Sequence, residues 1–259
     1  MNIMQNVDLA GFNTLAVPAR AAYFVEVTTL DELQEALAFS RQRNQAPVVL
    51  GGGSNVVLTG DIDGLVIRLA LRGVECSEHG DERLVTAAAG ENWHELVCYC
   101  IAQGCYGLEN LIAIPGSVGA APIQNIGAYG VELSKVLESV TGWDCEQSQL
   151  RTLSAEQCQL SYRDSIFKHE LKDRFIITSV CLRLSAIAHP EVSYPALRAE
   201  LSDPEQASPQ QIAEHVAVIR AAKLPDYRRE PNAGSFFKNP LISEEKATEL
   251  LGQYPSLAH

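Results

Sequence analysis

The sequence is short of basic residues and has no pair of cysteines at CxxC spacing. Its 259 residues include 20 Lys and Arg against 32 Asp and Glu, which gives a net charge of −12 at pH 7. This acidic balance argues against general binding to nucleic acid. The seven cysteines, an odd number without CxxC spacing, indicate neither a disulfide framework nor a zinc site. We therefore expect a reducing compartment, no bound metal and no nucleic-acid partner.

A long apolar run is also missing. No segment approaches the roughly 20 apolar residues that span a bilayer, and the first ten residues lack the charged head and apolar stretch of a secretory signal. We expect a cytoplasmic protein without membrane contact. What the sequence does contain is 46% hydrophobic and 7% aromatic residues, a composition typical of a globular protein.

The hydrophobic pattern alternates short strands with helices. The expected strands cover residues 23–27, 47–50, 65–69, 84–88, 136–143, 149–153 and 175–184, and the expected helices residues 29–43, 93–103, 204–222 and 243–251. Ser208 and Pro209 are capping residues near the start of the third helix. Residues 104–130 form a long loop rich in Gly, Ala, Pro and Asn, and such a loop inside a compact domain is more often functional than idle.

The first candidate binding element is the loop Gly51-Gly52-Gly53-Ser54-Asn55, which follows an expected strand. Residues without side chains allow successive backbone N–H groups to turn toward an anion, as a pyrophosphate site needs. The loop matches neither GxGxxG nor GxxxxGK[ST], so it does not support a Rossmann NAD site or an ATPase. Taken alone, a glycine triplet is equally compatible with a plain tight turn.

The second candidate element is the segment PGSVGAAPIQNIGAYG at residues 115–130. Small residues at this density let the backbone lie against a planar or phosphorylated ligand, while Ser117, Gln124 and Asn125 offer hydrogen bonds. Both loops together could hold one extended cofactor. The alternative is a structural crossover loop.

These motifs resemble those of a known family. GGGSN at 51–55, PGSVGAAPIQNIGAYG at 115–130, YRDSIFK at 162–168 and AGSFFKNP at 233–240 occur in the order seen in bacterial UDP-N-acetylenolpyruvoylglucosamine reductases, the MurB family. Asn13-Thr14 near the start and KLPD at 223–226 match as well. The resemblance covers nearly the whole chain, and the Ser193-Tyr194-Pro195 segment indicates the longer, tyrosine-loop subtype.

The resemblance implies an α+β protein with an FAD-binding fold of the vanillyl-alcohol-oxidase (PCMH) type. Residues 1–70 and 71–200 would be its two FAD-binding subdomains, and residues 201–259 an incomplete substrate-binding domain. In that family NADPH reduces noncovalently bound FAD, which passes hydride to UDP-N-acetylglucosamine enolpyruvate and forms UDP-N-acetylmuramate for peptidoglycan. We expect the same activity, a UDP-sugar substrate and a monomer.

The resemblance also assigns two catalytic residues. Hydride addition to an enolpyruvyl ether drives negative charge toward the carboxylate, so the site needs a fixed cation and a proton donor. Arg163 fills the first role, since arginine stays charged and grips a carboxylate in bidentate fashion, and Ser235 fills the second. Without the motifs, Arg163 would be read as a surface ion pair with Asp164, and Ser235 as a turn hydroxyl bonded to its own backbone.

Binding residues are carried over in the same way. Tyr194, Lys223 and Asn239 match positions that contact the nucleotide diphosphate and sugar. The expected FAD-binding residues are Gly51, Gly52, Gly53, Ser54, Asn55, Pro115, Gly116, Ser117, Gly119, Ala120, Gln124, Asn125, Gly127, Ala128 and Tyr129.

The chain departs from the family after the serine motif. The family's third domain continues further and supplies a glutamate near its C-terminus, whereas Glu244, Glu245 and Glu249 follow the serine motif too closely to match it. On this reading the chain is C-terminally short, and we expect it to bind FAD but to reduce its substrate very poorly.

Two other functions remain open from the sequence. One is a different noncovalent flavin oxidoreductase of the same fold, such as an oxidase acting on a sugar or lactone. Such oxidases often attach FAD covalently through a His or Cys, and no such residue lies near residues 51–55. The other is a flavin-binding fragment without turnover.

Overall fold

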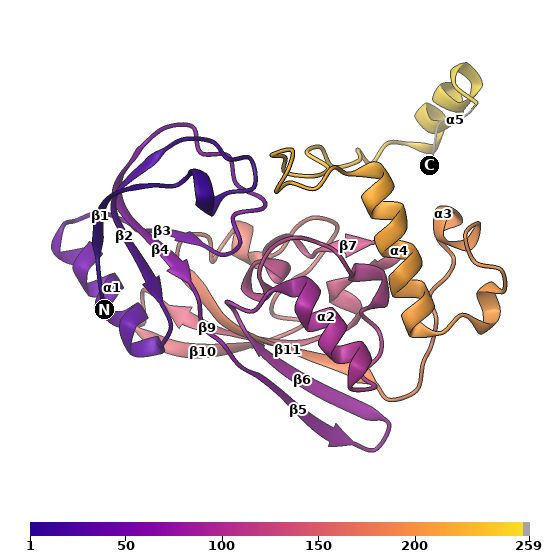
Figure 1. Cartoon of the computed structure of the whole chain (residues 1–259), viewed down its shortest axis with the longest axis horizontal. Helices are drawn as coiled ribbons and strands as arrows, with labels where there is room; N and C mark the ends of the chain where they lie inside the picture. Colours follow the sequence, from indigo (N-terminus) through magenta and orange to yellow (C-terminus); the bar gives the residue numbers. More distant parts are fainter. Residues whose placement is uncertain (256–259) are drawn as a thin grey trace.

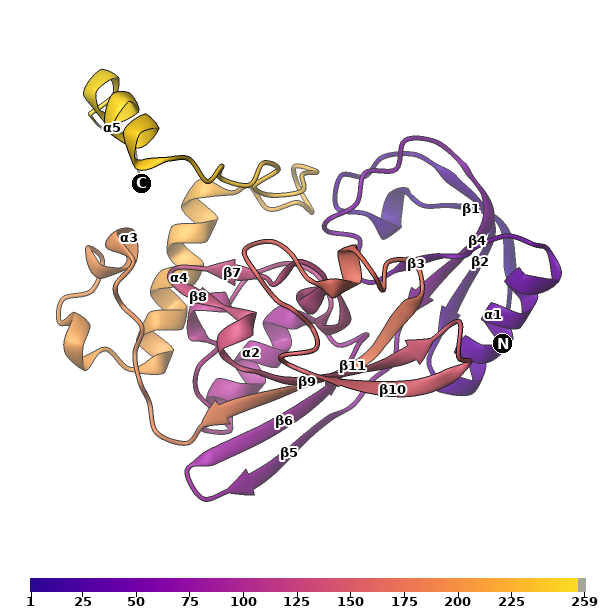
Figure 2. The same cartoon turned by 180° about the vertical axis from the view of Figure 1, so that it is seen from behind.

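The computed structural model describes residues 1–255, and it places two β-sheets side by side (Figures 1 and 2). The first sheet has the order β1-β2-β4-β3, and the second has the order β10-β9-β11-β6-β5. A third, two-stranded sheet pairs β7 (Gly127–Ala128) with β8 (Val131–Glu132). No helix in this part of the chain is long and apolar enough to cross a membrane.

The first sheet is built on a parallel β-α-β unit. Strand β2 (Arg20–Val27) pairs in parallel with β4 (Ile62–Leu69), which pairs in parallel with β3 (Val48–Leu50), while β1 (Met4–Asp8) adds an antiparallel edge. Helix α1 (Leu30–Gln42) connects β2 to β3, as parallel pairing requires a crossover. It begins at Thr29, whose hydroxyl accepts the Glu32 N–H at 3.2 Å. The glycine loop therefore leaves the carboxyl end of a strand in this sheet.

The second sheet is antiparallel throughout. Its strands are β5 (Val74–His79), β6 (Glu82–Ala88), β9 (Leu137–Asp144), β10 (Gln149–Ser154) and β11 (Phe175–Ser185). The central strand β11 is almost wholly buried. Helix α2 (Trp93–Ala102) follows β6, and its Trp93 is 1% exposed in the main apolar core.

The long loop expected at 104–130 folds into short turns rather than lying free. It contains the 3-10 helices η2 (Glu109–Leu111) and η3 (Val118–Gln124) and strand β7; η4 (Leu133–Lys135) follows β8, and η5 (Ile166–Lys168) precedes β11. Helix α4 (Pro209–Lys223) packs against η2. This packing carries the C-terminal part of the chain back over the second sheet.

After β11 the chain forms α3 (Pro195–Arg198), η6 (Pro204–Gln206), α4 (Pro209–Lys223) and α5 (Glu244–Gln253). Helix α5 has no buried residue and projects away from the body (Figures 1 and 2). Between α4 and α5 an irregular segment runs beside the first sheet.

Candidate active site

A cavity of about 1330 Å³ lies between the two sheets. Its walls come from both sheets, from η3, from the turn before η5 and from the segment that follows α4. Fourteen expected site residues line it, namely Gly51, Gly52, Gly53, Ser54, Asn55, Pro115, Gly116, Ser117, Gly119, Ala120, Gln124, Gly127, Arg163 and Ser235. Motifs up to about 180 residues apart therefore meet around one space.

The two glycine-containing loops are in direct contact. A Cβ on Gly51 would lie 2.1 Å from the Ser117 Oγ, and one on Gly52 would lie 2.8 Å from the Gly116 Cα. The Ser54 hydroxyl donates to the Pro115 carbonyl at 3.0 Å. The glycines are thus required for packing one loop on the other, a reason that the sequence pattern alone did not show.

Gly53 connects the loop to the N-terminal segment. Its φ of +64° lies in the left-handed region, and a Cβ there would be 2.0 Å from the Phe12 carbonyl oxygen. The Gly53 carbonyl accepts the Thr14 N–H at 3.0 Å, and the Thr14 carbonyl accepts the Asn232 N–H at 2.9 Å. Two hydrogen bonds thus join the glycine loop, the Asn13-Thr14 motif and the segment that carries Ser235.

The glycine loop presents free donors to the cavity. Within residues 1–255, the backbone N–H groups of Gly52, Gly53, Ser54 and Asn55 have no hydrogen-bond acceptor. Consecutive unpaired N–H groups form a concave site that favours anions. This arrangement fits the pyrophosphate of a dinucleotide, and the small side chains of the opposite loop leave room for it.

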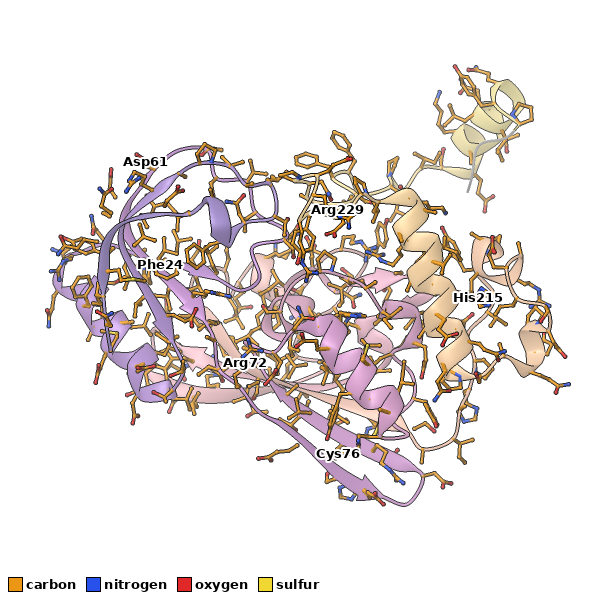
Figure 3. All side chains as sticks on the ribbon, viewed as in Figure 1. Phe24, Asp61, Arg72, Cys76, His215 and Arg229 are labelled. Carbon is orange, nitrogen blue, oxygen red and sulfur yellow. The ribbon has the colours of Figure 1, made fainter. Side chains whose placement is uncertain are left out.

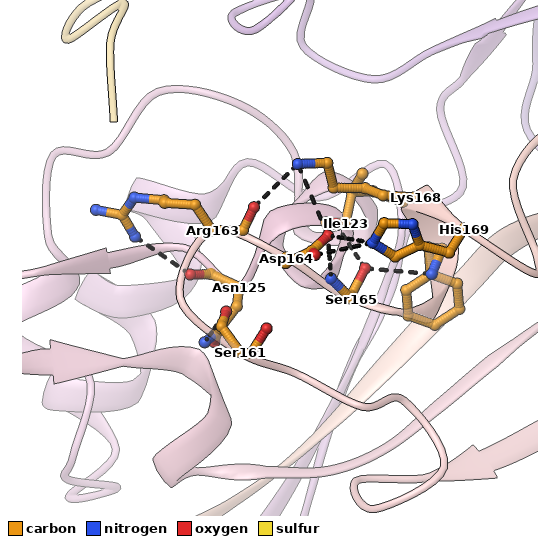
Figure 4. A network of polar contacts seen from close by, with 9 residues as sticks. Ile123, Asn125, Ser161, Arg163, Asp164, Ser165, Lys168 and His169 are labelled. Carbon is orange, nitrogen blue, oxygen red and sulfur yellow. Dashed lines mark hydrogen bonds and ion pairs between the residues drawn. The ribbon is translucent and has the colours of Figure 1, made fainter. Parts of the chain in front are cut away.

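Arg163 enters the cavity from a strained turn (Figure 4). Its φ of +55° is unusual for a bulky side chain, and such strain is concentrated at functional sites. The guanidinium donates to the carbonyls of Gly127 at 2.7 Å and Asn125 at 3.3 Å. No carboxylate of the described residues pairs with it, so the surface ion pair with Asp164 is not formed. The remaining N–H donors of Arg163 can bind a carboxylate.

Asp164 instead stabilises the turn that carries Arg163. Its carboxylate contacts the His169 Nε2 at 2.8 Å, and this hydrogen bond is the main reason that the pKa of Asp164 is lowered. The Lys168 ammonium donates to the Arg163 carbonyl at 3.0 Å (Figure 4). Hydrogen bonds within the turn that carries the YRDSIFK motif therefore stabilise the conformation of Arg163.

Ser235 lies at the cavity edge, on the segment between α4 and α5. Gly234 has a φ of +66°, and its N–H donates to the Asn232 side chain at 3.0 Å. Asn232 also donates to the Pro225 and Glu230 carbonyls. Figure 3 shows Arg229 of this segment between the first sheet and α4. Ser235 is thus an exposed residue of the cavity lining, on a loop that the Asn232 side chain bonds together.

Six expected binding residues lie away from the cavity wall. Asn125 is fully buried and bonds Glu132, Ser134 and Ser161 with its side chain. Tyr129 packs edge-on against Tyr194, with ring centroids 5.1 Å apart. Ala128 lies in β7, and Lys223 and Asn239 are exposed beyond the lining.

Arg220 is a lining residue that the sequence did not single out. It lies on α4, and its Nε donates to the Ala113 carbonyl at 3.3 Å. Burial lowers the pKa of its guanidinium, and no carboxylate of residues 1–255 pairs with it. The only sequence signal was its place one helical turn before Lys223. Three arginines of the cavity wall, Arg41, Arg163 and Arg220, thus have no acidic partner among residues 1–255, which suits an anionic ligand.

The same described region shows no group of three or more His, Cys, Asp or Glu side chains that could hold a metal ion.

Comparison with known proteins places this geometry among flavoproteins. A family model described as "FAD binding domain" matches residues 21–152. UDP-N-acetylenolpyruvoylglucosamine reductase from Dechloromonas aromatica is 46% identical over 99% of this chain and 77% of its own length. The enzyme of that name from Cupriavidus pinatubonensis is 49% identical over 95% of this chain and 73% of its own length.

Solved structures agree on the fold. The match to the crystal structure of UDP-N-acetylenolpyruvylglucosamine reductase from Thermus caldophilus covers 97% of this chain and 80% of that chain. Its TM-score is 0.68, and the sequence identity is 26%. The match to cholesterol oxidase from B. sterolicum covers 71% of this chain and 37% of that chain, with a TM-score of 0.53. Because the sequence identity is 13%, this match shows the fold alone. The expected α+β fold of the vanillyl-alcohol-oxidase (PCMH) type is confirmed.

Proposed function

Because the chain belongs to the UDP-N-acetylenolpyruvoylglucosamine reductase family, we propose that it reduces UDP-N-acetylglucosamine enolpyruvate to UDP-N-acetylmuramate in peptidoglycan precursor synthesis. FAD is bound noncovalently in the cavity, and NADPH is the source of the hydride. When bound, FAD supplies hydride transfer at its flavin ring. The remaining chemistry belongs to residues of this chain.

Two loops and the arginines Arg163 and Arg220 share this work in the cavity. The free N–H groups of residues 52–55 would hold the pyrophosphate of FAD, together with the loop at residues 115–127, which lines the same cavity. Residues 1–70 and 71–200 thus act as the two halves of the FAD site. Residues 201–259 form the substrate-binding part, which contributes Ser235, Arg220 and the end of α4.

Arg163 holds the carboxylate of the enolpyruvyl group. One hydride and one proton add across the carbon–carbon double bond, and negative charge develops on the carboxylate side before the proton arrives. The guanidinium of Arg163 donates hydrogen bonds to the carbonyls of Asn125 and Gly127, which fix its plane. Its remaining N–H donors therefore have a fixed orientation. A cation that is already oriented stabilises this charge without reorganisation.

Ser235 donates the proton to the carbon that carries the charge. The hydroxyl is a weak acid, but the enolic intermediate is a strong base, so a short, well-placed transfer suffices. Substrate binding also uses Tyr194, Lys223 and Asn239 around the diphosphate and sugar. In this structure Tyr194 packs edge-on against Tyr129, and Lys223 ends α4, where its charge also complements the helix dipole.

The observation that carries this proposal is Arg163, a strained, unpaired arginine that lines the same cavity as the glycine loops and Ser235. The test separates the two half-reactions under anaerobic conditions. Flavin absorbance should fall when NADPH is added and return when UDP-N-acetylglucosamine enolpyruvate follows. Ser235→Ala should slow the return about 100- to 10,000-fold, as for loss of a general acid, and leave the NADPH step unchanged.

Arg163→Lys should slow the return by about 10- to 100-fold, since lysine cannot bind the carboxylate in bidentate fashion. Matched controls are Ser202→Ala and Arg198→Lys, because both residues are exposed and lie outside the cavity lining. A wild-type protein whose NADPH-bleached flavin recolours no faster with this substrate than without it would refute the proposal. Flavin that stays with acid-precipitated protein would refute noncovalent binding.

A further inference from the structure

The side chain of Asn125 is a fully buried polar group outside the cavity lining. Its Oδ1 accepts the Ser134 N–H at 2.9 Å, which fixes the orientation of the side-chain amide. Its Nδ2 donates to the Glu132 carboxylate and to the Ser161 carbonyl, both at 3.0 Å. The amide thus joins the segment of β8 and η4 to the turn that carries Arg163 (Figure 4).

Glu132 lies close to Arg163, and Gly127 touches both residues. The pairing of β7 with β8 places Glu132 directly across from Gly127, whose carbonyl accepts the Arg163 guanidinium at 2.7 Å. A Cβ on Gly127 would lie 2.9 Å from the Glu132 Cγ and 3.0 Å from the Arg163 Nη1. The acidic side chain and the guanidinium therefore flank the same small space, which is open because residue 127 is a glycine.

A freely rotating carboxylate at this position would compete with a substrate carboxylate for Arg163. Opposite charges a few ångströms apart attract, and a guanidinium binds any carboxylate in the same bidentate fashion. In the structure the Glu132 Oε2 accepts from the Asn125 amide instead. The Arg163 guanidinium donates to the backbone carbonyls of Asn125 and Gly127. The Asn125 side chain thus engages the carboxylate that would otherwise neutralise the arginine.

We propose that Asn125 is a positioning residue that holds the Glu132 carboxylate away from Arg163 and so keeps the guanidinium available to the carboxylate of the substrate. The inference rests on the proposed function for the identity of that ligand. Asparagine suits this role because one neutral side chain donates to Glu132 and accepts from the Ser134 backbone. An ionised aspartate in its place would have no donor and would repel Glu132.

The test compares ligands with and without the carboxylate on the oxidised, FAD-loaded protein. Asn125→Asp keeps the side-chain shape but removes the donor, and Asn125→Gly suits the φ of +45° and adds no charge. Either change should weaken binding of UDP-N-acetylglucosamine enolpyruvate about 10- to 100-fold, as for loss of a charge-assisted contact, and leave affinity for UDP-N-acetylglucosamine unchanged. Titration calorimetry without NADPH measures both affinities. The affinity for FAD should not change, because Asn125 lies outside the cavity lining.

Rescue distinguishes this role from a purely structural one. Adding Glu132→Gln to Asn125→Gly removes the competing charge, so it should restore the selectivity for the carboxylate ligand while the stability of the protein stays reduced. Ser134→Ala is the matched control, because its hydroxyl is another neighbour of the Asn125 amide, at 3.4 Å, and carries no charge. This control should leave both ligand affinities unchanged.

A crystal structure of the Asn125→Gly variant should show the Glu132 carboxylate bonded to the Arg163 guanidinium. A carboxylate that turns to Lys135 instead, unaltered affinities in both Asn125 variants, an equal loss for both nucleotide sugars, a loss of FAD affinity or a failed rescue would overturn the inference. A wild type that does not bind or reduce the enolpyruvyl substrate would refute the proposed function alone, since the variant structure still decides whether Asn125 restrains Glu132.

Discussion

At the scale of single residues, Gly53 is the position where the site tolerates least change. Its φ is positive, and the Phe12 carbonyl oxygen lies 2.0 Å from the point where a Cβ would stand, so there is no room for a side chain. Gly53→Ala should lower the free energy of unfolding by at least about 2 kcal/mol and weaken FAD binding, because the loop must move. Urea unfolding and FAD titration measure the two effects.

The matched control for this change is Gly60→Ala. Gly60 has an ordinary φ and no atom within 4 Å of its Cβ position, so its substitution should alter neither property. Equal stability of the Gly53 variant and the wild type would show that the loop conformation is not required.

The sequence predicted which residues line the cavity better than it predicted the contacts that require those residues. It singled out Gly51–Asn55 for anion binding, but the loop contact with Gly116 and Ser117 depends on chain segments some 65 residues apart. It chose Arg163 through a motif, whereas the strained turn and the two carbonyl contacts appear only in three dimensions. Arg220 was not singled out because one arginine on an amphipathic helix carries no pattern of its own.

At the scale of elements, the start of α4 shows how a local signal sets a boundary. The expected helix began at residue 204, but residues 204–206 form a separate 3-10 turn and α4 begins at Pro209. Ser208 and Gln211 form a reciprocal capping box at this point. Ser208→Ala should lower the free energy of unfolding by about 1 kcal/mol in denaturant titration. Ser202→Ala, at an exposed position before the turn, should have no effect, and a matching loss there would contradict the capping role.

A second prediction at this scale concerns β5. Cys76 on β5 (Figure 3) and the buried Cys105 after α2 have Sγ atoms 3.7 Å apart. The pKa of Cys105 is raised to about 11, mainly by burial, so its thiol stays protonated. We therefore expect oxidation to begin at the exposed Cys76. Hydrogen peroxide should convert Cys76 to a sulfenic acid, and Cys105 then displaces water to form a disulfide.

Mass spectrometry should find this crosslink with the loss of two hydrogens, and dithiothreitol should reverse it. Cys98→Ser should still form it, while Cys105→Ser should not. A peroxide-treated wild type that carries only overoxidised Cys76 would contradict the prediction.

Seven strands were predicted from the sequence, including the edge strands β3 and β10, whereas the polar edge strands β1 and β5 were not. The expected ranges for β2, β3, β4, β6, β9, β10 and β11 overlap the observed strands. Strands β1 and β5 were missed because they are polar edges: every residue of β5 after Val74 is exposed, and β1 is similar. Edge strands form through pairing with a neighbour, a long-range effect that local hydrophobic periodicity does not report.

At the scale of the whole molecule, the two sheets and the segment after α4 are joined by few but specific contacts. The apolar cluster that contains Leu33 and Leu37 of α1 also includes Trp143 and Ile176 of the second sheet, so the two halves share apolar packing. The bonds from Gly53 through Thr14 to Asn232 add the C-terminal segment. Such pairings between distant parts of the chain could not be derived from the sequence, although the family resemblance located most of the residues that form them.

This architecture predicts how FAD should stabilise the protein. In the proposed site FAD would contact both sheets across a cavity whose walls already share a core, so unfolding should remain a single transition with and without FAD. At a free FAD concentration 100 times its Kd, the free energy of unfolding should rise by about 2.7 kcal/mol. ADP and FMN at the same multiple of their own Kd should raise it equally, because the gain depends only on saturation. Calorimetry with and without each ligand measures the number of transitions and the shift of the unfolding midpoint. Two resolved transitions, of which FAD shifts only one, would show that the cofactor is held by one half of the molecule and that the cavity between the sheets is not its site.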